Sequence, residues 1–178
     1  KYTGMVDWID GKDVLVKFSK GTEDMRKNTI AFAKDKINEA ILLMTKDNKD
    51  ETYMINWLKV LKESFTNMIT INPQDFSIST RVSKPTTTYK SNLVHVALAK
   101  KLIQEGKMLE IVESAKSSGT RIEYIITSSE GGLESVLTSE FNGIWDRKYY
   151  WNIQIFAPLK RILSTVFPEH DWTQYIIV

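Results

Sequence analysis

A run of basic side chains without any acid is the feature of this sequence that most clearly suggests chemistry. Five Lys or Arg residues lie between Arg81 and Gln104, and no Asp or Glu interrupts them. Such a cluster can bind a phosphate backbone even when the whole chain is nearly balanced, here with 24 basic and 22 acidic residues. A solvated loop and helix face is the alternative interpretation, because most lysine-rich runs are of that kind.

The charge changes sign along the second half of the chain. Residues 81–107 carry six basic residues and one acid, a net charge of +5, whereas residues 108–145 carry two basic residues and six Glu, a net charge of −4. This contrast predicts a basic side that can face a polyanion and an acidic side that is turned elsewhere.

Catalytic and metal-binding patterns are absent from the sequence. It contains no Gly-rich phosphate loop, no GxSxG and no HExxH. The two histidines, His95 and His170, have no neighbours at ligand spacing, and the absence of cysteine excludes disulfides and thiolate ligands. We therefore expect no catalytic residue, no metal site and no cofactor in this chain.

Hydrophobic periodicity predicts an α+β fold with a β-hairpin, several helices and a small antiparallel strand element. The hairpin lies within 5–18 and turns at Asp10-Gly11. Helices follow from Ile30 to Met44 and from Met54 to Met68, each with an apolar stripe that we expect in the core. The later elements are strands at 76–82 and 120–127, a Gly131-Gly132 turn after the second of them, and a last helix from Asp146 toward Phe167 with a kink or break at Pro158.

The start of the first helix is a candidate phosphate site. Arg26 and Lys27 precede this helix, which Asn28 or Thr29 can cap. The free N–H groups at a helix N-terminus bind anions.

A helix that opens at Ser91 or Asn92 is a second candidate of the same kind. Its residue Lys100 lies opposite the apolar stripe of Val94, Leu98 and Leu102, where it can meet solvent or a backbone. His95 lies near the stripe, so a buried histidine and a phosphate contact are both open for it.

Five motifs occur in the order found in one enzyme family. The segment TRVSKPTTTYKSNLVHVALAKKL (80–102) stands with KYTGMVDW at the N-terminus, KGTEDMRKNT (20–29), GTRIEYIIT (119–127) and DRKYYWNIQIFAPLKRIL (146–163). Together they resemble family B DNA polymerases from Lys1 to about Trp172. The chain departs from the family pattern at Lys27, where a second Arg is usual, and at Asn28, where Asp is usual.

The resemblance implies the C-terminal thumb of a DNA-directed DNA polymerase, a nucleotidyltransferase of DNA replication, with the edge of the palm attached. Residues 1–78 would form the palm-edge hairpin and the thumb base helices, and residues 79–178 the thumb tip and C-terminal helix. The palm carboxylates that hold the catalytic Mg ions do not occur here, so we expect a fragment or split subunit.

The expected partners are the primer–template DNA duplex and the remaining palm, fingers and exonuclease parts, with no membrane. A processivity factor stays open, and the expected location is intracellular, at the site of replication. The alternative function is a non-enzymatic helical module that docks an acidic protein partner.

The residues that we expect to bind DNA lie on or beside these motifs and carry a positive charge or a hydrogen-bonding group. They are Lys1, Tyr2, Lys20, Arg26, Lys27, Arg81, Lys84, Tyr89, Lys90, Asn92, His95 and Lys100. For Tyr2, a packed hairpin tyrosine is the alternative.

Overall fold

The chain forms two compact units, each described by itself. The computed structural model describes residues 2–9, 12–20, 28–91, 93–108 and 119–178, with the backbone alone in the first two ranges. One unit comprises residues 1–69 and 147–178, and the other comprises residues 70–146. The parts 1–78 and 79–178, inferred from the resemblance, stay a prediction. The compact units divide the chain differently, because its C-terminal helical region packs with the first two helices.

The first unit begins with an antiparallel hairpin of β1 (Tyr2–Ile9) and β2 (Lys12–Lys20). The strands pair with Val6 opposite Val16, and the register shifts between Val6 and Trp8. The hairpin predicted from the sequence is therefore confirmed, whereas its Asp10-Gly11 turn lies outside the described residues.

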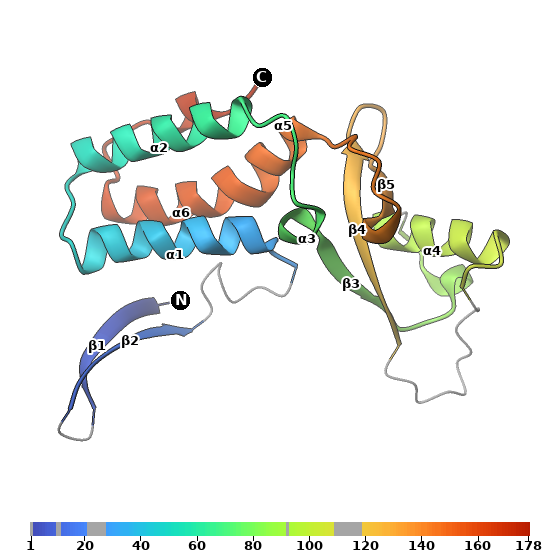
Figure 1. Cartoon of the computed structure of the whole chain (residues 1–178), viewed down its shortest axis with the longest axis horizontal. Helices are drawn as coiled ribbons and strands as arrows, with labels where there is room; N and C mark the ends of the chain where they lie inside the picture. Colours follow the sequence, from blue (N-terminus) through green and yellow to red (C-terminus); the bar gives the residue numbers. More distant parts are fainter. Residues whose placement is uncertain (1, 10–11, 21–27, 92, 109–118) are drawn as a thin grey trace. The chain divides into compact units, whose positions relative to one another are not determined.

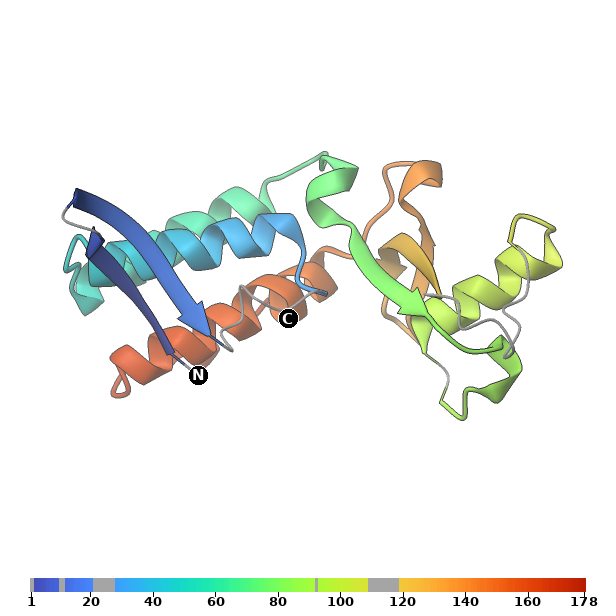
Figure 2. The same cartoon turned by 90° about the horizontal axis from the view of Figure 1, so that it is seen from below.

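Three longer helices of this unit lie side by side (Figure 1 and Figure 2). They are α1 (Ala31–Thr45), α2 (Glu51–Thr66) and α6 (Ala157–Val166). The helix α2 begins after Asp50, whose carboxylate accepts a hydrogen bond from the Tyr53 amide at 2.9 Å. The predicted cap of α1 by Asn28 or Thr29 is wrong, because the N-cap position belongs to Ile30, whose side chain cannot cap.

The core of this unit comes from the stripes that the sequence indicates. The α2 residues Met54, Leu58, Leu61 and Phe65 are buried, as are Ala33, Ile37, Ala40 and Ile41 of α1. The Phe65 ring meets Trp151 with 5.3 Å between centroids, which joins α2 to the C-terminal region.

The predicted helix from Asp146 toward Phe167 is confirmed in its extent, because helical residues run without a gap from Arg147 to Val166, but its middle is a π-helix. A short α5 (Arg147–Tyr149) leads into a π-helix, η4 (Tyr150–Phe156), and then into α6, in whose first turn Pro158 is buried. The wider winding of a π-helix accommodates the missing N–H of this proline. Asn152 of η4 donates to the Ile177 carbonyl at 2.8 Å and accepts from the Ile177 amide at 2.9 Å, which fastens the residues after η5 (Trp172–Tyr175).

The second unit is a three-stranded antiparallel sheet with a helix packed against it (Figure 1). The strand order is β3 (Ile78–Val82), β4 (Thr120–Ser128) and β5 (Glu134–Leu137), and the packed helix is α4 (Val94–Gln104). Short helical turns flank the strands: α3 (Pro73–Phe76), η2 (Thr86–Thr88) and η3 (Thr138–Glu140). The α+β class predicted from the sequence is confirmed. Among the described helices, none combines the length and the apolar character needed to cross a bilayer.

Along β3 and β4, successive side chains point alternately to the face of the sheet that packs against α4 and to the outer face. Val82 and Ile122 are buried, while Arg81 and Arg121 beside them in sequence are exposed. Because side chains alternate along a strand, Arg81 and Arg121 belong to the outer face.

Candidate nucleic-acid interface

The loop from β3 to α4 carries three of the described residues that we expect to bind DNA, and it is held by its own side chains. The Tyr89 hydroxyl accepts a hydrogen bond from the Ser83 amide at 3.2 Å, and Thr88 Oγ1 donates to the Pro85 carbonyl at 2.8 Å. Proline fixes its own backbone angle and favours the η2 turn that follows. The loop therefore has a defined course, and it presents Lys84 and Lys90, both exposed, to solvent.

His95 lies beside this loop at the start of α4. Its ring stands perpendicular to the Tyr89 ring, with 6.4 Å between centroids. Partial burial lowers the pKa of His95 below its ordinary value, so the imidazole is neutral at neutral pH. A neutral His95 adds no charge to a phosphate site, although it can still donate one hydrogen bond.

The helix α4 presents its basic residue as the sequence predicts, but its start differs. Lys100 is exposed, and Leu98 and Leu102 on the opposite side are buried. The N-cap position belongs to Leu93 without a side-chain hydrogen bond, so the predicted cap by Ser91 is wrong, and Asn92 lies outside the described residues.

The exposed basic residues of the second unit fall into a neutralised and a free group. Lys107 lies 2.8 Å from Glu140 and 3.1 Å from Glu105, and Lys101 lies 4.0 Å from Glu105. Within the described part of this unit, five other basic side chains form no ion pair: Arg121 and, in the basic segment 81–107, Arg81, Lys84, Lys90 and Lys100. These five therefore carry positive charge without a carboxylate at ion-pair distance in the described chain.

The remaining predicted residues lie in the hairpin or outside the described chain. Tyr2 and Lys20 are directly opposite each other in the β1–β2 register. Lys1, Arg26 and Lys27 are outside the described residues.

One basic residue of the second unit was not among the DNA-binding residues predicted from the sequence. Arg121 lies in the acid-rich segment, but β4 pairs with β3 so that Arg121 is directly opposite Arg81. Its Nη1 donates to Ser79 Oγ at 3.1 Å. The alternation in TRIEYI could have placed Arg121 on an exposed strand face, whereas its pairing partner depends on contacts distant in sequence.

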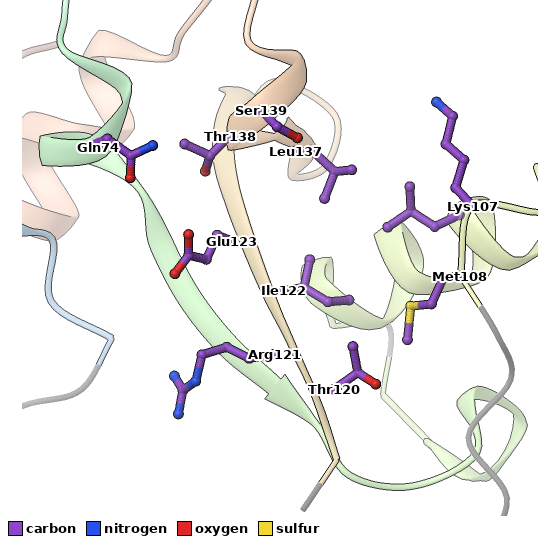
Figure 3. A pocket seen from close by; sticks show the side chains of 11 residues that line it. Gln74, Lys107, Met108, Thr120, Arg121, Ile122, Glu123, Leu137, Thr138 and Ser139 are labelled. Atoms are coloured by element: carbon purple, nitrogen blue, oxygen red, sulfur yellow. The ribbon is translucent and has the colours of Figure 1, made fainter.

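A hollow of about 440 Å³ lies beside this sheet (Figure 3). Lys107, Arg121 and Thr138 are among its lining residues. Within the described ranges, no three His, Asp or Glu side chains gather as metal ligands would. The lining thus mixes these polar groups with an acid, Glu123, and with apolar side chains such as Leu102 and Leu137.

Comparison with known proteins bears on the whole chain. Residues 1–166 match the sequence model of DNA polymerase family B. A DNA polymerase of Methanocaldococcus jannaschii is 29% identical over 153 residues, which are 83% of this chain and 9% of that protein. A DNA polymerase of Pyrococcus horikoshii is 28% identical over 164 residues, which are 88% of this chain and 12% of that protein. The chain thus spans about a tenth of the length of these curated relatives.

A solved structure shows the same fold. The family B DNA polymerase from the hyperthermophilic archaeon Pyrobaculum calidifontis is similar with a TM-score of 0.60 and 16% identity. The likeness covers 81% of this chain and 18% of that protein. At this identity the match concerns the fold alone.

Proposed function

The chain belongs to DNA polymerase family B, since the family's sequence model matches residues 1–166, and we propose that it grips the primer–template duplex as the thumb of such a polymerase. The small share of each relative that the chain spans supports a role as one part of a larger enzyme. Nucleotidyl transfer by two magnesium ions would take place on palm carboxylates outside this chain. Its partners would be the duplex and the other polymerase parts, at a site of replication inside the cell.

The observation that carries this proposal is the free positive charge of the second unit. Arg81, Lys84, Lys90 and Lys100 are exposed and form no ion pair with a described residue. Such side chains can neutralise phosphates without first breaking an internal pair, and each phosphate contact releases counterions from the duplex. Contacts to phosphates position a protein without reading bases, which suits an enzyme that must hold any sequence.

The test uses the full chain and a fluorescein-labelled duplex of mixed sequence, with anisotropy measured over a series of salt concentrations. The wild-type chain should bind with little sequence preference and with an affinity that falls steeply as salt rises. Replacing Lys90 and Lys100 together by Gln should weaken binding by about 1 to 3 kcal/mol and flatten the salt slope by roughly two units if both contact phosphate.

The matched control replaces Lys46 and Lys59, two exposed lysines of the first unit, by Gln. This control should change affinity and slope far less than the Lys90 and Lys100 pair. Equal losses from both pairs would show that general charge drives binding, against a placed surface. A salt slope near zero for the wild type, or displacement of the duplex by an acidic protein at much lower concentration than by unlabelled DNA, would favour the helical docking module instead.

A further inference from the structure

Two arginines face each other across the β3–β4 ladder. Arg81 and Arg121 are register partners, and each alternates with a buried residue, Val82 or Ile122. Directly opposite residues of an antiparallel pair point to the same face of the sheet. In Figure 3, Arg121 and Glu123 extend to one side of β4 and Ile122 to the other. Both guanidinium groups therefore belong to the outer face.

This arrangement is unfavourable in the free chain unless something compensates it. Like charges directly opposite each other in a sheet repel. Glu123 is on the same face but is the register partner of Ser79, and in the described chain neither arginine forms an ion pair. The two side chains thus start from directly opposite positions, and neither has a carboxylate at ion-pair distance in the described chain.

Arg121 is also held in position. Its Nη1 donates to Ser79 Oγ at 3.1 Å and to the Ser79 carbonyl at 3.4 Å, which occupies one of the guanidinium nitrogens. A guanidinium carries five N–H donors, so most of them remain available. An oriented arginine with free donors loses less conformational entropy on binding than a mobile one.

We propose that Arg81 and Arg121 together bind one phosphate group, that of a backbone phosphodiester in duplex DNA. A phosphate accepts hydrogen bonds from both forks, and its negative charge removes the repulsion between them. The inference rests on the proposed grip on the duplex and adds to it a specific pair, one member of which lies outside the basic segment 81–107. Gly119 keeps the strand ends close beside the pair, because its Cα approaches Val82 so tightly that a Cβ would lie 2.6 Å from the Val82 carbonyl oxygen.

The test compares Arg81→Gln, Arg121→Gln and the double variant in the full chain, with the labelled mixed-sequence duplex as probe. Each single variant should lose roughly tenfold in affinity. The double variant should lower the salt slope by about one unit, because the two arginines share one phosphate. Lys59→Gln, an exposed single-charge control in α2, should leave the affinity within about twofold of the wild type.

Thermal unfolding without DNA separates binding from folding. Arg121→Gln should leave the melting temperature unchanged or raise it, since the repulsion is relieved. If the wild-type chain binds the duplex and Arg121→Gln binds it with the same affinity, the shared phosphate site is overturned but the proposed grip on the duplex is not. A salt slope that falls by two units in the double variant would also overturn the shared site. A melting temperature that falls by more than about 5 °C in Arg121→Gln would overturn it as well. Failure of the wild-type chain to bind the duplex at all would overturn both proposals.

Discussion

Replacing Gly119 by Ala should destabilise the second unit more than any other glycine substitution in its described part. Gly119 has φ +68°, and an L residue in this left-handed region costs about 1 to 2 kcal/mol. The added Cβ would also lie 2.6 Å from the Val82 carbonyl oxygen and 2.9 Å from the Ser83 Cα. Both neighbours are backbone atoms, so the ends of β3 and β4 must separate, which costs roughly 1 to 3 kcal/mol more.

Gly106→Ala is the matched control, because Gly106 has nearly the same backbone angle, φ +70°, and no atom within 4 Å of its ideal Cβ. It should cost about 1 to 2 kcal/mol, the backbone term alone. Urea unfolding followed by circular dichroism gives both free energies of unfolding. Hydrogen exchange read by mass spectrometry shows whether the extra loss in Gly119→Ala is confined to the amides of β3 and β4.

Equal losses in the two variants would refute the reasoning, since they would mean that the Gly119 backbone does not approach Val82 closely. The same result would weaken the Arg81–Arg121 argument, because Val82 is opposite Thr120, one residue along the same ladder. Faster exchange throughout the chain would refute the claim that the strain is local.

Two further predictions concern single side chains. Burial lowers the pKa of His95 from about 6.5, so its stabilising contribution is present above that pH and is lost as the pH falls toward the folded pKa. The wild-type chain should therefore lose more stability between pH 7 and pH 5 than His95→Gln does. Urea midpoints that change in parallel for the two proteins over this range would contradict the prediction. Arg147 donates to the Thr66 carbonyl at 3.1 Å and the Met68 carbonyl at 2.7 Å at the end of α2. Because these bonds are exposed, Arg147→Ala should cost about 1 kcal/mol in thermal unfolding, whereas Lys148→Ala should change stability by less than about 0.5 kcal/mol.

The sequence predicted those elements whose signal is local. The apolar stripes of α1 and α2, the hairpin and the strands around 78–82 and 120–128 follow from periodicity over a few residues. The helix caps were wrong because capping competes with packing. Ile30 is 1% exposed, and its burial brings an apolar residue to the N-cap position where Asn28 or Thr29 was expected. The π-helix at 150–156 has no comparable local signal, and it fits the bonds of Asn152 to Ile177, a residue 25 positions away.

The charges of the candidate site also depend on contacts between residues distant in sequence. Net charge along the sequence suggested separate basic and acidic sides, but β3 pairs with β4, so the two segments mix in one sheet. Lys107 of the basic segment is neutralised by Glu140 of the acidic one, whereas Arg121 of the acidic segment joins Arg81. The acid-free stretch therefore indicated where basic residues without a carboxylate partner occur. Strand pairing and ion pairs in the fold decide which individual residues these are.

This pairing sets how strongly the second unit can respond to salt. Of the six basic residues in 81–107, Lys101 and Lys107 have carboxylate partners, which leaves four, and Arg121 makes five. If Arg81 and Arg121 share one phosphate, the described part of this unit neutralises at most four phosphates. The corresponding slope of log K against log salt is about −3.6, at −0.9 for each phosphate. A count of basic residues in the segment 81–107 alone would treat Lys107 as a phosphate contact and would omit Arg121. Lys107→Gln should accordingly leave the slope unchanged, whereas replacing Arg81 and Arg121 together by Gln should lower it by about one unit. The reverse order would show that ion pairs within the chain open when the duplex binds.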